Sequence, residues 1–193
     1  MKVRLKELAA VQTGYSFRSR LDTSERGGIA VIQMKDLRDD NTVDSQSLVK
    51  VDMNGMKEHH LVRKGDLVFR SRGLDTTSAV LLEDAKRAVV AAPLLRIRVN
   101  DSDKVLPEYL NWYLSQREAQ LFLDRRAKGT FQKMIGKEVI EELEIFLPVL
   151  EKQKCIVEMA KLSGHEQALL HELAEKRDQY ISTVLMQLAK GET

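Results

Sequence analysis

The feature that most constrains this chain is a long stretch of helix-forming sequence near its C-terminus. Residues 150–189 contain no proline and only one glycine, Gly164. Apolar residues form a broad stripe along this stretch at helical spacing, so they share one face of a helix. They are Ile156, Met159, Ala160, Leu170, Leu173, Ala174, Ile181, Val184, Leu185 and Leu188. About 40 residues of helix extend roughly 60 Å, so a small domain cannot cover this stripe and another long helix is needed.

The sequence changes character near Pro148, before which short apolar runs alternate with turn residues. Residues 3–11 have the spacing of a short amphipathic helix. Residues 29–34, 67–69 and 94–99 are typical of strands. Residues 79–82 and 88–91 are typical of the two arms of a hairpin. Pro107 suits a first helical turn, and helical spacing continues over 108–127.

These patterns predict an α+β fold, with a mixed sheet and peripheral helices, followed by a long C-terminal α-helix. We expect a globular domain over residues 1–148 and a helical arm over 149–193, which pairs as an antiparallel coiled coil or bundle. Gly164 disfavours a helix interior by about 1 kcal/mol and is a candidate kink. The alternative is two shorter helices that fold back on each other as a hairpin.

Composition excludes several classes of protein. Lys and Arg total 31 against 29 Asp and Glu, so a nucleic-acid interface must come from the arrangement of charges rather than from net charge. The single cysteine, Cys155, excludes an internal disulfide and a multi-cysteine zinc site. No apolar run approaches the roughly 18 residues of a membrane span, and no signal peptide is evident. We expect a cytoplasmic protein with no membrane partner.

The acidic and histidine residues do not form a convincing catalytic or metal site. Asp75 with Asp84 and Lys86 has only the loose spacing of a metal-dependent nuclease. His59 and His60 are adjacent, and no further ligand cluster lies near them in the sequence. We therefore predict no catalytic residue, no metal and no cofactor.

The clearest basic segment runs from Arg125 to Lys137, with no acidic residue inside it. Arg and Lys neutralise phosphates, whereas Gln can form two hydrogen bonds with an adenine edge. The predicted DNA contacts here are Arg125, Arg126, Lys128, Thr130, Gln132 and Lys133. The alternative is a solvated loop after a helix whose C-terminus favours positive charge.

Two further segments are candidates for DNA contact. Arg70, Ser71 and Arg72 follow an apolar strand, and Gly73 permits close approach of the backbone to a ligand. The alternative role for the two arginines is ion pairing within the domain. The remaining candidates are Tyr15, Ser16, Arg18 and Arg20, together with Lys35 at the end of a predicted strand.

Six motifs in a fixed order resemble the specificity subunit of type I restriction–modification systems. They are VRLKELAAVQTG at 3–14, LVRKGDLVFRSRG at 61–73, LPEYLNWYL at 106–114, Gly129-Thr130 with Gln132, LPVLEKQKCIV at 147–157, and KRDQYISTVLMQLAKGE at 176–192. Two departures concern the entry to the helical spacer, where Leu147 and Leu150 stand at positions that are usually proline. The chain also has one copy of a module that the family usually repeats, and we find no internal repeat.

The resemblance implies a non-catalytic, half-sized reader of double-stranded DNA with one target-recognition domain and one helical spacer. Its implied partners are a modification subunit, which carries adenine methylation, and a restriction subunit, which carries motor and nuclease activity. The missing second copy suggests a homodimer on a bipartite palindromic site. Its helix contacts would be Ile156, Met159, Leu170, Leu173, Ile181, Val184 and Leu188. The alternative is an assembly or decoy module that binds modification subunits through its helix.

Overall fold

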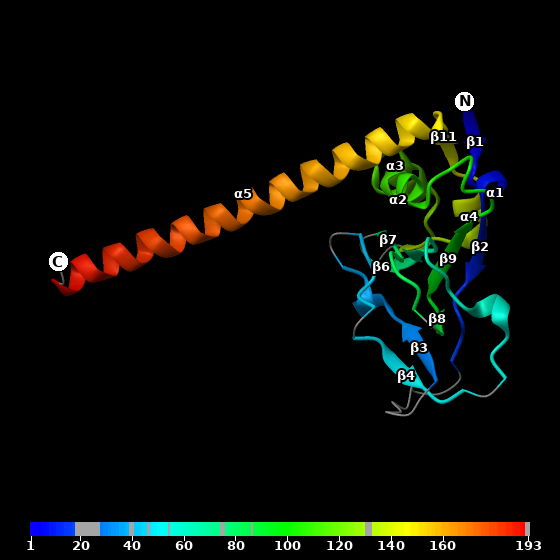
Figure 1. Ribbon diagram of the computed structural model, residues 1–193, viewed down its shortest axis with the longest axis horizontal. Helices are drawn as coiled ribbons and strands as arrows, with labels where there is room; N and C mark the ends of the chain where they lie inside the picture. Colours follow the sequence, from blue (N-terminus) through cyan, green and yellow to red (C-terminus); the bar gives the residue numbers. More distant parts are fainter. Residues whose placement is uncertain are drawn as a thin grey trace. The chain divides into compact units, whose positions relative to one another are not determined.

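The computed structural model describes residues 1–17, 28–38, 41–45, 47–53, 55–73, 76–85, 87–129 and 133–191. It divides into two units, Met1–Lys154 and Cys155–Thr193 (Figure 1). The first unit mixes strands with short helices, and the second consists of one helix. The predicted α+β fold followed by a long C-terminal helix is therefore confirmed. Among the described residues, no helix is both long and apolar enough to span a membrane.

The first unit is built on two small sheets. An antiparallel sheet has the strand order β2 (Ala9–Thr13), β9 (Leu94–Val99), β5 (Leu67–Arg70) and β7 (Ser78–Val80). The second sheet has the order β4 (Val49–Val51), β3 (Ile29–Ile32) and β8 (Ala88–Val90), with β8 parallel to β3. Buried side chains of both sheets, including Ile32, Val68 and Leu94, form one apolar cluster. This shared core fixes the two sheets against each other.

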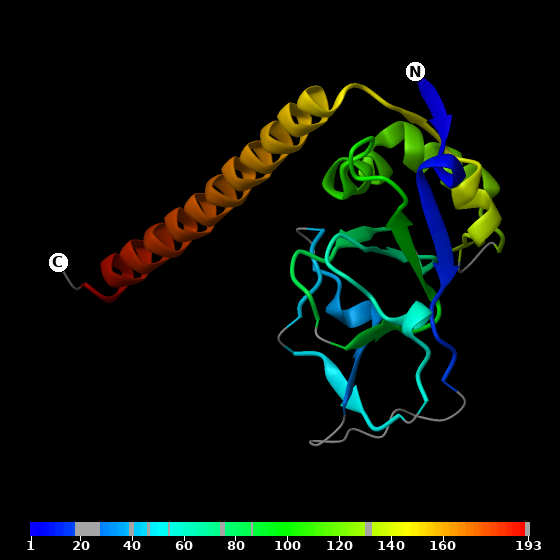
Figure 2. The ribbon, with the colours of Figure 1, turned by 45° about the vertical axis from the view of Figure 1, so that its right-hand side comes forward.

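Helices and two short strand pairs complete the first unit. β1 (Lys2–Arg4) pairs with β11 (Glu144–Phe146), and β6 (Arg72–Gly73) pairs with β10 (Lys133–Met134). The remaining elements are α1 (Leu5–Leu8), η1 (Met34–Asp36), η2 (Glu58–His60), α2 (Pro107–Ser115), α3 (Arg117–Arg126) and α4 (Lys137–Glu141). Figures 1 and 2 show α2 and α3 at the end of the unit that holds β1 and β11, far from β3 and β4.

The strand predictions that rest on the pattern of a single segment are confirmed. The predictions that depend on which segments pair with each other are wrong. β5 and β9 are confirmed, and β3 ends at Ile32, two residues earlier than predicted. The predicted hairpin over 79–91 is wrong, because β7 pairs with β5 whereas β8 pairs with β3. The predicted helix over 3–11 is also wrong outside Leu5–Leu8, since β1 and β2 join strands far along the chain.

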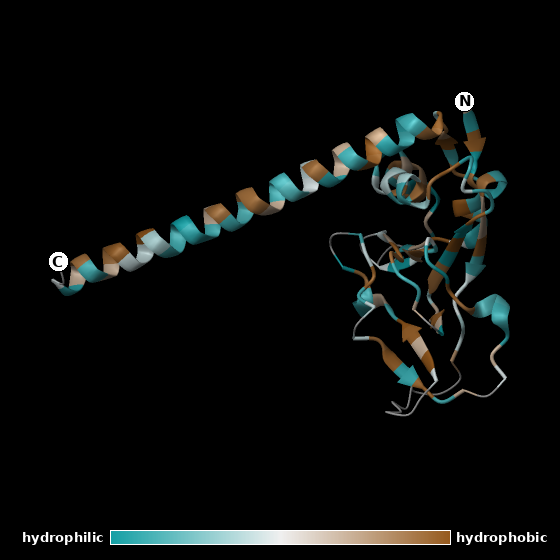
Figure 3. Cartoon of the chain, in the orientation of Figure 1, coloured by the Kyte–Doolittle hydropathy of each residue, from teal (hydrophilic) through white to brown (hydrophobic). Residues whose placement is uncertain are grey.

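Two helix predictions had different outcomes. The predicted helix over 108–127 is interrupted at Gln116, whose backbone is extended and separates α2 from α3. In contrast, α5 (Leu150–Lys190) is continuous over 41 residues and passes through Gly164 without a break. The hairpin alternative is therefore wrong. Figure 3 shows apolar residues recurring along the whole of α5, and most of its large apolar side chains are exposed.

Candidate nucleic-acid interface

A turn formed by Ala91–Leu94 holds several of the predicted DNA-contact segments together. The backbone N–H of Gly14 donates to Leu94 O at 2.9 Å, and Ala92 N–H donates to Tyr15 O at 2.9 Å. On the other side of the turn, Ala91 N–H donates to Ile32 O at 2.9 Å. The hydroxyl of Ser71 donates to the carbonyl of Pro93. Segments that are far apart in the sequence are therefore bonded to one turn.

Gly14 permits the close approach of its segment to this turn. A Cβ atom at position 14 would lie 2.7 Å from the carbonyl carbon of Ala91 and 2.7 Å from the carbonyl oxygen of Leu94. Both neighbours are backbone atoms, which cannot rotate away as a flexible side chain can. A side chain at this position would push the Tyr15 segment off the turn.

Two basic segments that are separate in the sequence lie side by side. Arg72 pairs with Met134 and Gly73 with Lys133 in the β6–β10 ladder. Ile135 N–H donates to Ser71 O at 2.8 Å, which extends this pairing toward β5. We call residues 14–17, 34–36, 70–73, 91–94, 128–129 and 133–135 the loop cluster. The loop cluster contains the described parts of every segment predicted to contact DNA, apart from the end of α3.

The basic side chains of the loop cluster differ in what they contact. Arg72, Lys128 and Lys35 are exposed. Lys133 is half-buried, and its Nζ lies 2.8 Å from Oδ1 of Asp124. Arg70 is half-buried, and its Nη2 donates to the carbonyl of Met34 at 3.0 Å, which ties β5 to η1. The surface therefore presents three exposed cations, while Arg70 and Lys133 also hold protein groups.

The 3₁₀ helix that carries Lys35 is held by a buried carboxylate. Asp36 accepts a hydrogen bond of 2.7 Å from the backbone N–H of Gln33, in a reciprocal cap with the Gln33 side chain. Burial raises the pKa of Asp36, and the hydrogen bond from Gln33 opposes this shift. The cap fixes the backbone of η1 and so fixes where Lys35 leaves the surface.

Of the two arginines at the end of α3, Arg126 faces away from these residues. Arg125 and Arg126 are exposed, and the guanidinium of Arg126 lies 3.8 Å from the centre of the Phe122 ring. Arg126 also lines a hollow with Lys2 and Glu144, on β1 and β11. The structure thus places Arg126 toward β1 and β11 rather than in the loop cluster.

The N-terminal segment adds an aromatic group. Tyr15 is half-buried, and its ring meets the edges of Phe17 and His60 at centroid distances of 5.0 and 5.5 Å. Ser16 beside it is exposed. Burial, and then the positive charges of His59, Arg96 and Lys57, lower the pKa of His60. Four predicted contacts lie outside the described residues, namely Arg18, Arg20, Thr130 and Gln132.

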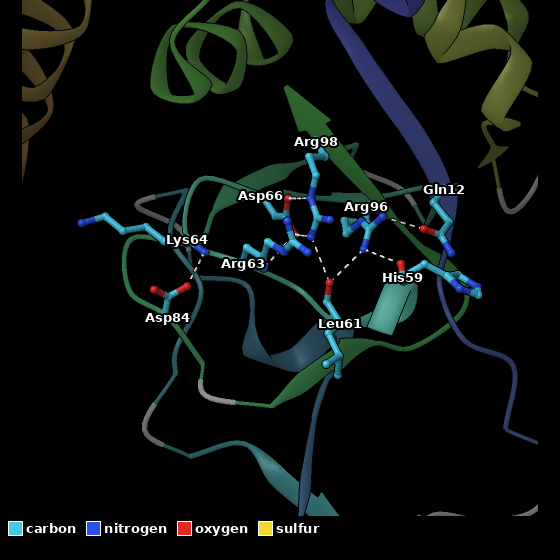
Figure 4. A network of polar contacts seen from close by, with 9 residues as sticks. All are labelled: Gln12, His59, Leu61, Arg63, Lys64, Asp66, Asp84, Arg96 and Arg98. Carbon is cyan, nitrogen blue, oxygen red and sulfur yellow. Dashed lines mark hydrogen bonds and ion pairs between the residues drawn. The ribbon is translucent and has the colours of Figure 1, made fainter. Parts of the chain in front are cut away.

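A network around Arg96 and Arg98 of β9 was missed by sequence reasoning (Figure 4). Arg98 donates to both carboxylate oxygens of Asp66 at 2.7 and 2.6 Å, and the side chain of Asp66 is 1% exposed. Arg96 is buried, and it donates to the carbonyls of His59 and Leu61 and to Oε1 of Gln12.

The hydrogen bond to Asp66 raises the pKa of Arg98, whereas burial lowers the pKa of Arg96. The signal in the sequence is the spacing of Arg96 and Arg98, which lie two residues apart and so share one face of a strand. Where that face is buried, their guanidinium groups need carbonyl or carboxylate acceptors. Within the part of the chain that the structure describes, no cluster of three or more His, Cys, Asp or Glu is arranged to hold a metal ion.

Comparisons with solved structures show where this fold occurs. The chain is similar to one in a structure of the assembly and conformational transition of a type I restriction–modification system, with 24% identity and a TM-score of 0.67. It is also similar to the HsdS subunit from Thermoanaerobacter tengcongensis, with 22% identity and a TM-score of 0.65. A type I S subunit from M. genitalium has 14% identity and a TM-score of 0.58.

The matched regions cover most of this chain but less than half of each solved chain. The three comparisons cover 88%, 88% and 91% of this chain, and 39%, 38% and 41% of the solved chains. A comparison with curated proteins finds no match. The model of the type I restriction modification DNA specificity domain matches residues 1–175. This chain therefore belongs to the type I restriction modification DNA specificity domain family.

Proposed function

We propose that this chain is the sequence-reading subunit of a type I restriction–modification complex, and that its loop cluster contacts one half of the DNA target. The observation that carries the proposal is that segments far apart in the sequence, each a candidate for DNA contact, meet in the loop cluster. Arg72, Lys128 and Lys35 are exposed there, and exposed Lys and Arg are the groups that bind the phosphate backbone. The half-buried Tyr15 and the exposed Ser16 lie beside them as candidates for base contact.

Residues outside the described ranges complete the proposed reading surface. Arg18 and Arg20 follow Tyr15 in the sequence, and Thr130 and Gln132 precede β10 in the sequence. We assign Gln132 to base reading because its amide can pair with an adenine edge. Arg125 and Arg126 are assigned to backbone phosphates outside the loop cluster, and Arg70 and Ser71 to holding the reading surface in place.

The chemistry belongs to partner subunits in this proposal. A modification subunit methylates adenine, and a restriction subunit supplies motor and nuclease activity. The exposed apolar stripe of α5 is the proposed assembly surface, through Ile156, Met159, Leu170, Leu173, Ile181, Val184 and Leu188. Two copies joined by α5 would present two loop clusters related by a two-fold axis. A two-fold symmetric reader requires two identical half-sites in inverted orientation, separated by a fixed gap.

Salt-dependent binding to duplex DNA tests the loop cluster directly. The triple variant R72A/K128A/K133A is expected to bind every duplex more weakly. Its plot of log affinity against log salt should flatten by about one unit for each phosphate that the protein no longer neutralises. The matched control, K2A/R4A/K6A, removes three cations from β1 and α1 that pair with Glu142 and Glu144. We expect this control to keep the wild-type salt slope.

A salt slope unchanged in R72A/K128A/K133A would refute phosphate contact by the loop cluster. A chain that binds the modification subunit but no duplex, alone or in the complex, would favour the assembly or decoy role instead. Sequencing of methylated sites after co-expression with the modification subunit would identify the target. A palindromic pair of half-sites with a fixed gap is the expected result.

A further inference from the structure

Two opposite charges lie in the middle of the exposed apolar stripe of α5. Glu166 lies seven residues after Met159 and four before Leu170. Arg177 lies four residues after Leu173 and seven before Val184. Intervals of four and seven return to the same face of a helix. Any helix that covers this stripe must therefore bury both Glu166 and Arg177.

Three pairs of side chains on α5 lie within ion-pair distance of each other on the same helix. Lys161 lies 3.0 Å from Glu158, His171 lies 3.3 Å from Glu175, and Lys176 lies 3.4 Å from Glu172. Among the residues that the structure describes, Glu166 and Arg177 form no such ion pair. They lie 11 positions apart on one helix, about 16 Å at 1.5 Å per residue, so they cannot pair with each other within one chain.

We propose that α5 pairs antiparallel with α5 of a second copy, in the register that places Glu166 opposite Arg177 of the partner subunit. The inference rests on the homodimer proposed above and adds its register. Glu166 lies five residues before His171, and Arg177 lies five residues after Glu172. The two-fold axis therefore passes between His171 and Glu172, and symmetry forms the Glu166–Arg177 pair twice.

The same register also brings several other residues of the stripe together. Leu170 faces the partner's Leu173, and Met159 faces the partner's Val184, so apolar residues meet on both sides of each ion pair. Ser163 faces the partner's Tyr180, which places a small side chain opposite a large one. Leu170, Leu173 and Met159 are 59%, 64% and 66% exposed in the single chain, so this pairing would cover a large apolar surface.

Neighbouring registers and the parallel orientation lack this match. A shift of seven residues in either direction keeps the stripes in contact but sets Glu166 against the partner's Leu170 or Val184. Each shift buries charges without a partner, which is strongly unfavourable. A parallel pair sets Glu166 against Glu166 and Arg177 against Arg177. The two charges thus select one register and one orientation, as single polar core residues do in coiled coils.

Charge reversal in the full chain tests this register by analytical ultracentrifugation. Glu166→Arg alone places arginines opposite each other, and Arg177→Glu alone places glutamates opposite each other. We expect each single variant to raise the dimer Kd by at least about a hundredfold, because a buried pair is replaced by like charges. A one-to-one mixture of the two variants should form heterodimers in which every charge is paired again. The double variant E166R/R177E should dimerise like the wild type.

A control and three outcomes make the test decisive. Glu175→Arg reverses a charge on the face opposite the stripe and should change the dimer Kd by less than about twofold. Single variants that keep the wild-type Kd, or a mixture that associates no more tightly than either variant alone, would overturn the register but leave the homodimer standing. A wild-type chain that stays monomeric at every concentration, alone and with the modification subunit, would overturn the homodimer itself. DNA contact by the loop cluster would be unaffected by either result.

Discussion

In residues 1–154 most of the large apolar side chains that the structure describes are buried, whereas on α5 most of them are exposed. Phe69 and Leu110 are 0% exposed, while Leu170 and Leu173 are 59% and 64% exposed. Some charged groups differ in the same direction: Asp66 and Arg96 are buried with protein partners in the first unit, whereas the charged residues of α5 are exposed. The first unit therefore covers most of its own apolar surface, whereas α5 has an apolar stripe that is exposed in the single chain.

Loss of a buried charge partner gives the largest effect expected in the first unit. Asp66→Ala removes the acceptor of two hydrogen bonds from Arg98 and one from the backbone N–H of Arg63. Arg98 would remain half-buried without its carboxylate, so we expect the free energy of unfolding to fall by about 3 kcal/mol. Urea unfolding followed by the fluorescence of Trp112, the single tryptophan, measures this change.

The matched control removes a surface carboxylate from the same unit. Asp101 pairs with Lys104 at 3.2 Å, and the two side chains are 42% and 72% exposed. Asp101→Ala should change the free energy of unfolding by less than about 1 kcal/mol, as is usual for exposed pairs. Equal effects of the two substitutions would mean that the Asp66 network contributes no more to the free energy of unfolding than a surface ion pair does. The contrast between the buried charges of the first unit and the exposed charges of α5 would then carry less weight.

Two glycines provide a smaller test of the same contrast. Gly14→Ala would place a Cβ against the backbone of Ala91 and Leu94, and overpacking of this kind costs about 2 kcal/mol. The Tyr15 segment would also move off the Ala91–Leu94 turn. We therefore expect lower stability of the first unit, together with weaker DNA binding. Urea unfolding and duplex titration measure the two effects.

Gly164→Ala should act in the opposite direction. A Cβ at Gly164 meets no atom within 4 Å, and alanine favours a helix interior over glycine by about 1 kcal/mol. Thermal melting of α5, followed by far-ultraviolet circular dichroism, should shift upward, with no change at Trp112. Destabilisation by Gly164→Ala would instead indicate that the bound partner helix approaches α5 closely at this position.

The sequence predicted those elements whose pattern is local. The stripe of α5 and the alternation of Leu94–Val99 are complete within one segment, so periodicity found both. The pairing of β8 with β3 rather than with β7 depends on residues about 60 positions away, which no local pattern encodes. The strand before α1 was missed for the same reason, since its partner is β11 at Glu144–Phe146.

The sequence predicted several residues of the candidate site but did not predict which groups those residues contact. Residue type makes Arg70 and Arg72 equal candidates for DNA contact. In the structure, however, Arg70 donates a hydrogen bond to the carbonyl of Met34, whereas Arg72 is exposed in β6. The segment that contains Lys133 has no acidic residue, yet Nζ of Lys133 lies 2.8 Å from Oδ1 of Asp124 in α3. Arg96 and Arg98 were not nominated, because their acceptors come from η2 and from the turn before β5. Such partners follow from the tertiary fold alone.

The smallest expected effect is on the pH dependence of the free energy of unfolding, and it comes from the hydrogen bond between Gln12 and His60. Gln12 uses Oε1 to accept from Arg96, so its Nε2 faces Nδ1 of His60 at 3.2 Å and donates to it. Nδ1 accepts this bond only when it carries no proton. Burial, with His59, Arg96 and Lys57 nearby, lowers the pKa of His60 in the folded chain. The folded state thus binds fewer protons than the unfolded state, in which the pKa of histidine is about 6.5.

The stability that neutral His60 contributes is therefore complete above about pH 6.5 and is lost as the pH falls below it. His60→Gln removes this titration, so its free energy of unfolding should fall less steeply between about pH 7 and pH 5. The difference should stay below about 1 kcal/mol, the usual contribution of one neutral hydrogen bond. Urea unfolding at a series of pH values measures it, with His165→Gln on the exposed surface of α5 as the matched control. Parallel pH curves for the wild type and His60→Gln would show that the network ends at Gln12, without His60.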